Sequence, residues 1–175
     1  MGKQWIAWMI LMLLGGGLWG CSPQVDQQGA SAEAAARFAV SRSETEWKKL
    51  LPAQTFAVMR KHDTEPPFNN KYDRNKADGV YYCASCGQHL YDAKHKYDSG
   101  TGWPSFYKPI ETSLIGTRQD NTLFSVRTEV HCSRCGGHLG HVFDDGPKPT
   151  GLRYCMNSAA LSFHKRGETP PPLLK

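Results

Sequence analysis

The chain has 175 residues, which fits a single domain with short appendages. Its formal net charge of +5 is spread along the sequence, and no block of Lys and Arg is typical of a nucleic-acid groove or a polybasic membrane patch. The 17 Gly and 11 Pro favour many short strands and turns over a helical bundle. We therefore expect a monomeric, β-rich domain that does not bind nucleic acid.

The first twenty residues have the layout of a bacterial export signal. Lys3 supplies a short positive region, and the ten apolar residues at 5–14 are too few for a spanning helix but suit the core of a signal peptide. Leu18, Gly20 and Cys21 then resemble a lipobox, with Cys21 at +1. Residues 1–20 are predicted to be a lipoprotein signal peptide and Cys21 the lipidated residue; a signal anchor or ordinary cleavage is the alternative.

Lipidation at Cys21 implies a protein anchored to a membrane of the bacterial cell envelope, at the periplasmic face. Ser22 lacks the acidic charge that often marks inner-membrane retention, which favours the outer membrane. Residues 21–41 are rich in Gln, Ala and Ser with almost no large apolar side chain. This composition predicts a flexible linker between the membrane and the folded domain.

Two short helices are predicted at the start of the domain. Ser43 and Glu46 match a capping box, in which each side chain bonds the other's backbone N–H. The apolar face of this first helix is expected at i, i+3 and i+4: Trp47, Leu50 and Leu51. Pro52 is expected to end that helix and to stand at the first position of a second, whose buried side carries Phe56 and Met59.

Beyond residue 79 the pattern changes to strands separated by Gly, Pro and Asp. The predicted strands lie at 80–83, 90–91, 123–130, 138–143, 152–156 and 161–163. These features predict a mainly antiparallel β domain at 42–166. The Pro-rich tail at 167–175 is expected to be disordered or extended.

Four cysteines fall in a short repeat, since residues 83–90 and 132–139 both read C-x-x-C-G-x-H-L. The repeat supplies the four thiolates of a closed tetrahedral Zn²⁺ site, namely Cys83, Cys86, Cys132 and Cys135. In an exported protein the same residues are also compatible with two disulfides. The repeated spacing, with Gly after each second Cys, favours zinc.

Cys155 belongs to neither pair. A lone thiol in a chain that also contains histidines is a candidate nucleophile, and the alternative is a buried cysteine acting as a small apolar residue. Two other functions remain open at this point. One is a zinc module that binds partners without catalysis, and the other is a thiol-disulfide oxidoreductase that uses one Cys-x-x-Cys pair.

From Glu44 to Lys165 the sequence resembles the B-type methionine sulfoxide reductases, which reduce methionine-R-sulfoxide. The two Cys pairs and four other motifs carry the resemblance: 64–68 (TEPPF), 97–106 (YDSGTGWPSF), 137–143 (GHLGHVF) and 153–158 (RYCMNS). The resemblance implies a mainly β fold, with two antiparallel sheets joined around a zinc site of four cysteines and short N-terminal helices. It also implies one structural Zn²⁺ per chain.

The resemblance further implies roles for particular residues. Cys155 is the nucleophile that attacks the sulfoxide sulfur, and an acid must protonate the departing oxygen. His138 and His141 are the candidates for acid and hydrogen-bond donor, and Asn157 for a hydrogen bond in the same site. Apolar walls for the substrate's methyl group are assigned to two aromatic residues, Trp103 and Phe163.

One position departs from the family pattern. Many members carry a resolving cysteine in the S-G-x-G-W-P loop, where this chain has Thr101. Attack leaves Cys155 as a sulfenic acid, and the remaining thiols are already assigned to zinc or to lipid. We therefore expect a thioredoxin-like or other external thiol reductant to regenerate Cys155, in an enzyme that repairs oxidised methionine in the cell envelope.

Overall fold

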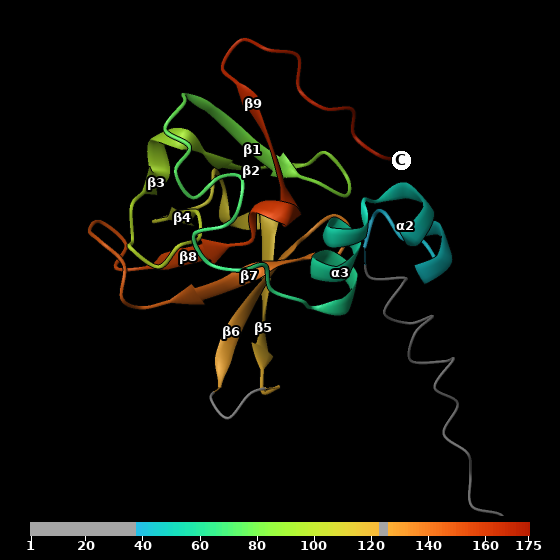
Figure 1. The fold of residues 1–175 in the computed structure, drawn as a ribbon, viewed down its shortest axis with the longest axis horizontal. Helices are drawn as coiled ribbons and strands as arrows, with labels where there is room; N and C mark the ends of the chain where they lie inside the picture. The colour runs from blue at the N-terminus through green and yellow to red at the C-terminus, as the bar shows by residue number, and fades with distance from the viewer. Residues whose placement is uncertain (1–37, 123–125) are drawn as a thin grey trace, which may run out of the picture.

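The structure, a computed structural model, describes residues 38–122 and 126–175. In these residues the strands form two antiparallel sheets, one with the order β2-β1-β9 and a larger one with the order β3-β4-β8-β7-β6-β5 (Figure 1). The predicted fold class is thereby confirmed. The predicted signal peptide and Cys21 lie outside the described residues. No helix of the described part is long and apolar enough to cross a membrane.

Two short helices precede the sheets, α2 (Glu44–Leu50) and α3 (Ala53–Lys61). The predicted capping box between Ser43 and Glu46 starts α2. Trp47 and Leu51 are buried, but Leu50 is 54% exposed, because the chain leaves the helix at Leu51 and only a narrow stripe faces the core. In α3, where Pro52 stands at the N-cap and not at the first helical position, the buried side includes the predicted residues: Phe56 and Met59.

The smaller sheet consists of β1 (Gly79–Cys83), β2 (His89–Asp92) and β9 (Leu161–Lys165). Burial alternates along β1, which puts Tyr81 in the interior. Its ring meets Phe163 of β9 at 4.9 Å between centroids and Phe106 of the larger sheet at 5.1 Å. These aromatic contacts hold the two sheets together over a shared core.

The larger sheet has six strands in the described residues: β3 (Lys96–Tyr97), β4 (Ser105–Phe106), β5 (Ile115–Asp120), β6 (Arg127–Cys132), β7 (His138–Phe143) and β8 (Arg153–Met156). Three short 3-10 turns connect strands: η1 (Ala93–His95), η2 (Thr112–Leu114) and η3 (Ser158–Ala160). The sequence did not predict β5. After Ile115 and Gly116 its residues are polar, and three of the six are exposed, so the strand lacks the apolar alternation by which strands are found.

The N-terminal end of the described chain is packed where the flexible linker was predicted. Val40 is only 2% exposed, and its N–H donates to the Arg134 carbonyl at 3.0 Å. The Phe38 ring lies against Gly136, so close that a Cβ at that glycine would overlap it. Residues 38–41 are therefore part of the domain, because their two large apolar side chains find partners that composition alone does not reveal.

The C-terminal tail is extended, one of the two predicted states, and it is ordered against the domain. The Leu174 N–H donates to the Cys86 carbonyl at 3.0 Å, and Arg134 donates to the Leu174 carbonyl at 2.9 Å. The Pro172 carbonyl oxygen lies too close to where a Cβ on Gly87 would be for any side chain to fit there. Figure 1 shows the tail running back toward α2 and ending near it.

Candidate active site and metal centre

The four cysteines of the two repeats come together at the junction of the sheets. Cys83 ends β1 and Cys132 ends β6, so each sheet contributes one Cys-x-x-Cys knuckle. The sulfurs of Cys83 and Cys135 are 3.6 Å apart, and those of Cys86 and Cys132 are 3.7 Å apart. All four side chains are buried, and all four sulfurs lie within 4.8 Å of one another.

The knuckles share one backbone conformation. In the first, Gly87 donates to the Cys83 carbonyl at 2.9 Å; in the second, Gly136 donates to the Cys132 carbonyl at the same distance. Both glycines have positive φ, 76° and 66°, which favours glycine at this point of the turn. The repeat in the sequence is therefore a repeat in structure.

The residues present fit a thiolate-bound metal ion. A tetrahedral site with metal–sulfur bonds of about 2.3 Å has sulfur–sulfur edges of about 3.8 Å, close to the spacings in this cluster. The sulfurs face those of the opposite knuckle, which is the arrangement of one shared site. Four thiolates complete a tetrahedron, so the metal has no open position for a substrate.

Cys155 lies in the middle of a row of residues that crosses the larger sheet. The strand register pairs it with Ser105 on one side and His141 on the other. His141 is paired in turn with Glu129 of β6, and Glu129 with Arg118 of β5. Residues directly opposite on neighbouring strands point to the same face of a sheet, so the row gathers these side chains on one surface.

A cavity of about 100 Å³ opens beside Cys155. Its lining includes three apolar side chains and three polar ones: Trp103, Phe143, Met156, Cys155, His141 and Asn157. Small-molecule and cofactor pockets are usually about 300–1,000 Å³. The cavity therefore has the scale of one amino-acid side chain, with a thiol, an imidazole and aromatic walls.

Two further residues assigned to the site from sequence line this cavity and are held by hydrogen bonds. The Trp103 indole N–H donates to the Glu65 carbonyl at 2.9 Å, which fixes the ring. Asn157 is 3% exposed; its amide donates to the Leu139 carbonyl at 3.3 Å and accepts from the Glu65 N–H at 3.2 Å. Both the oxygen and the nitrogen of the Asn157 amide thus bind backbone groups, so this side chain holds the cavity wall in place.

Phe163 was assigned to the substrate wall, but the structure puts it in the other sheet. Its ring packs on Tyr81 and Tyr72, and it is not part of the cavity lining. Phe143 of β7 lines the cavity, with the Arg153 guanidinium 4.3 Å from its ring centroid. The resemblance implies an aromatic wall for the substrate, and the fold shows that Phe143, not Phe163, contributes to it.

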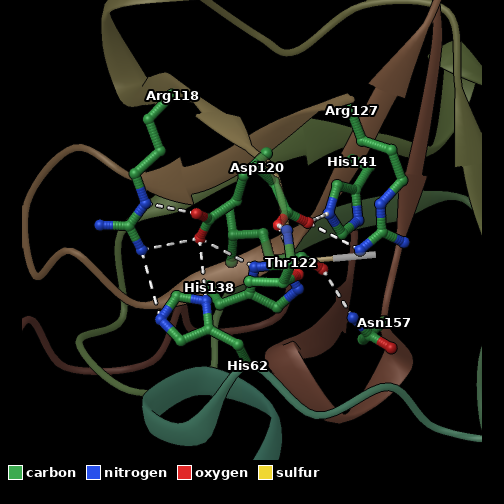
Figure 2. Close-up of polar contacts among 10 residues, drawn as sticks. His62, Arg118, Asp120, Thr122, Arg127, His138, His141 and Asn157 are labelled. Carbon is green, nitrogen blue, oxygen red and sulfur yellow. Dashed lines mark hydrogen bonds and ion pairs between the residues drawn. The ribbon is translucent and has the colours of Figure 1, made fainter. Parts of the chain in front are cut away.

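The two histidines assigned to the site have separate carboxylate partners (Figure 2). His141 Nε2 lies 2.7 Å from Asp120 Oδ2, which also accepts from Arg127 at 2.7 Å. Burial lowers the pKa of His141, and the hydrogen bond to Asp120 acts in the opposite direction. The pKa of Asp120 lies well below its usual range. The main cause is the hydrogen bond from the Thr122 hydroxyl, followed by the one from the Thr122 N–H, so Asp120 is an anion.

His138 is behind His141 and does not line the cavity at Cys155. It is 2% exposed, and its Nδ1 lies 2.9 Å from the buried Glu129 carboxylate. Arg118 donates to both oxygens of Glu129, and His62 lies 3.4 Å from one of them. Burial alone would raise the pKa of Glu129, but bonds from His138, His62 and Arg118 outweigh it and lower the pKa strongly.

The cluster of His62, Glu129 and His138 has the donor atoms of a metal site, within 4.8 Å of one another. The Arg118 guanidinium already donates to both oxygens of the Glu129 carboxylate. The charge of Glu129 is therefore balanced by the chain's own cation, and the cluster needs no metal.

The Cys155 thiol is partly buried, and burial raises its pKa. The Thr101 hydroxyl, 3.9 Å from the sulfur, and the Arg153 guanidinium act in the opposite direction. Thr101 is linked to Ser99 at 2.9 Å, and Ser99 to Ser105 at 2.7 Å. A chain of hydroxyls therefore stands next to the sulfur.

Sequence reasoning missed several residues of this site. Asp120, Glu129 and Arg118 lie on β5 and β6, and their position opposite the histidines depends on strand register. Glu65 was within a quoted motif but had no assigned role; its carboxylate accepts from the Ser158 and Ala159 N–H groups and anchors the segment after Cys155.

The fold and the site define a class of protein: a mainly β domain whose two sheets meet at a cluster of four cysteines that could hold a metal, with a fifth cysteine beside a small cavity. The SelR domain model matches residues 51–165, and the chain belongs to this family.

Proteins named peptide methionine sulfoxide reductase MsrB are among its relatives. The one from Methanosarcina barkeri is 51% identical over 133 residues, covering 76% of this chain and 94% of that protein. The one from Leptospira interrogans is 47% identical over 128 residues, covering 73% and 98%. The one from Pseudomonas putida is 47% identical over 127 residues, covering 73% and 97%.

Proposed function

We propose that this chain is a peptide-methionine (R)-S-oxide reductase in which Cys155 is the nucleophile. One observation carries the proposal: Cys155 lies in register with His141 at a side-chain-sized cavity walled by Trp103 and Phe143. Apolar walls suit the methyl and methylene groups of methionine sulfoxide, while the thiol and imidazole meet its polar S–O group. The names of the relatives support the same activity.

The reaction needs a thiolate and a proton. The Cys155 thiolate attacks the sulfoxide sulfur, and His141 gives a proton to the oxygen, which is otherwise a poor leaving group. The attack forms a bond between the two sulfurs. The protonated oxygen then moves to the Cys155 sulfur as this bond and the methionine sulfur–oxygen bond break, so that methionine leaves with two electrons from Cys155 and Cys155 becomes a sulfenic acid. Arg153, whose charge favours the thiolate form of Cys155, assists the first step.

Regeneration uses an external reductant of the thioredoxin-like or another thiol class. The first thiol condenses with the sulfenic acid, releases water and forms a mixed disulfide; a second thiol then restores Cys155. The described residues support this route, because the variable position of the S-G-x-G-W-P loop carries the hydroxyl of Thr101, 3.9 Å from the Cys155 sulfur, and not a thiol.

The cysteine cluster holds one structural Zn²⁺. Bound there, the ion links the two sheets and contributes to folding without acting on substrate. For the whole protein we propose a lipid anchor on Cys21 and a place in the bacterial cell envelope. The lipobox-like Leu18–Cys21 segment supports the anchor, and mass spectrometry of the membrane fraction for an acylated Cys21 tests it.

A stereospecific assay tests the activity. Purified protein is given a methionine sulfoxide peptide in its R or S form, with dithiothreitol as reductant. Turnover of the R form alone is expected, and without reductant each molecule should release one methionine and leave a dimedone-trappable sulfenic acid on Cys155. Absence of R-sulfoxide turnover by zinc-loaded protein would overturn the proposal.

A further inference from the structure

The Asp120 carboxylate contacts His141, which lines the cavity, and both of its oxygens are hydrogen-bonded. Oδ2 accepts from Arg127 and meets His141 Nε2, each at 2.7 Å. Oδ1 accepts from the Thr122 N–H at 3.0 Å and the Thr122 hydroxyl at 2.5 Å. Four donors thus converge on two oxygens, and with only 12% of its side chain exposed, Asp120 has a fixed orientation.

This contact decides which ring nitrogen of His141 is free. An ionised carboxylate only accepts hydrogen bonds, so Nε2 carries the hydrogen in its bond to Asp120. Nδ1 of His141 has no hydrogen-bond partner among residues 38–122 and 126–175. Nδ1 is therefore the nitrogen available to a ligand in the cavity that His141 lines.

The same contact decides when His141 can act as an acid. With its hydrogen on Nε2, the neutral ring has only a lone pair at Nδ1 and cannot donate there. Donation from Nδ1 requires the doubly protonated imidazolium, which a carboxylate at hydrogen-bond distance stabilises.

We propose that Asp120 is the positioning residue for His141: it presents Nδ1 to the cavity and stabilises the imidazolium that protonates the sulfoxide oxygen. The inference rests on the proposed function. The proton leaves Nδ1 as the methionine sulfur–oxygen bond breaks and the oxygen joins Cys155. The imidazolium becomes a neutral ring still bonded to Asp120 through Nε2.

The second histidine–carboxylate pair does not compete for this role. Glu129 is shared among His138, His62 and Arg118, and His138 is outside the cavity. The titratable and charged groups around His141 come from four strands: Asp120 of β5, Arg127 and Glu129 of β6, His138 of β7, and Cys155 of β8. Of these, Asp120 is the anion in direct contact with the His141 ring.

The test compares Asp120→Asn with Asp92→Asn as a matched control. Asp92 has a similarly buried side chain, 9% exposed, and also accepts from an arginine and a backbone N–H, but it lies in the smaller sheet. The readout is the pH dependence of single-turnover methionine release.

Asp120→Asn should slow methionine release by about tenfold or more at neutral pH, with little change in KM. The alkaline limb of its profile should move to lower pH, because an imidazolium without its anion loses its proton more easily. Asp92→Asn should leave rate and profile unchanged. An unchanged profile in folded Asp120→Asn would overturn the inference.

A double-mutant cycle separates the inference from the acid role itself. His141→Gln should slow methionine release about a hundredfold, and adding Asp120→Asn to it should cause no further loss. Additive losses would overturn the inference alone, whereas wild-type rates in His141→Gln would overturn the acid role as well. If Asp120→Asn fails to fold, Asp120→Ser takes its place. Its alkaline limb should also move to lower pH, because it too lacks the anion at His141 Nε2, and no movement would overturn the inference.

Discussion

The metal-binding knuckles and the cavity at Cys155 are built in opposite ways. Each knuckle is one local turn, with its two cysteines separated by two residues and a glycine of positive φ behind them. The cavity takes its reactive groups from several strands and a loop, held together by sheet register. The first kind of site is encoded in a few consecutive residues, and the second exists only in the folded sheet.

The two sites nevertheless share one hairpin. Cys132 and Cys135 form the turn between β6 and β7, the strands that carry Glu129 and His141. A metal ion bound by the four cysteines would fix the turn of the hairpin that carries His141, and four thiolates leave it no open position for a substrate. Loss of the Cys155 thiol should abolish activity and leave stability unchanged, whereas loss of a cluster cysteine should lower stability first. Three variants test this difference.

Cys155→Ser should have the largest effect on activity. Removing the nucleophilic sulfur should reduce sulfoxide turnover to background, a loss of roughly a thousandfold or more. Metal content and melting temperature should stay at wild-type values, because the substitution changes little volume and touches no cluster ligand. Atomic emission analysis, a thermal melt and the R-sulfoxide assay measure the three quantities. Wild-type turnover in this variant would show that another group is the nucleophile.

Cys86→Ser should have the complementary effect. With one of four ligands lost, the protein should bind zinc poorly, and the link between the sheets should weaken. We expect the melting temperature to fall by about 10 °C or more, with activity falling as the unfolded fraction grows. The nearby His89 should not replace the lost ligand, because its side chain is exposed and outside the cluster. A metal-free protein as stable as the wild type would contradict a structural metal.

Thr101→Cys should have the smallest effect on the first step and a clear effect on recycling. The Thr101 hydroxyl is 3.9 Å from the Cys155 sulfur, so a thiol there is within reach of the sulfenic acid after a small loop adjustment. A disulfide between residues 101 and 155 should form after one turnover and be reduced faster by a thioredoxin-like donor, by a few fold. Thr101→Ser is the matched control and should form no disulfide. A disulfide from Cys155 to a cluster cysteine in the wild type, with zinc release, would contradict the external-thiol route.

The parts predicted from sequence are those in which neighbours along the chain decide the structure. The capping box at Ser43, the knuckles and the strands with apolar alternation are local patterns. Asp120 could not be found in this way, because β5 is polar and its place opposite Arg127 depends on a hairpin pairing. Phe163 and Phe143 follow similar strand patterns, and only the fold shows that the first packs on Tyr81 and the second lines the cavity.

The packing of both chain ends has a consequence for how the protein can be handled or joined to other molecules. Residues 38–41 contact one knuckle, and the segment from Pro172 to Leu174 contacts the other, so both ends of the described chain converge on the metal centre. An affinity tag, a fused domain or a surface attachment at the C-terminal Lys175 would therefore be introduced beside the cysteine cluster. The residues that line the cavity at Cys155 are a different set and would remain open to substrate. A label for following catalysis can be placed at the C-terminus without crowding the Cys155 thiol, whereas a label for following metal loss is best placed elsewhere.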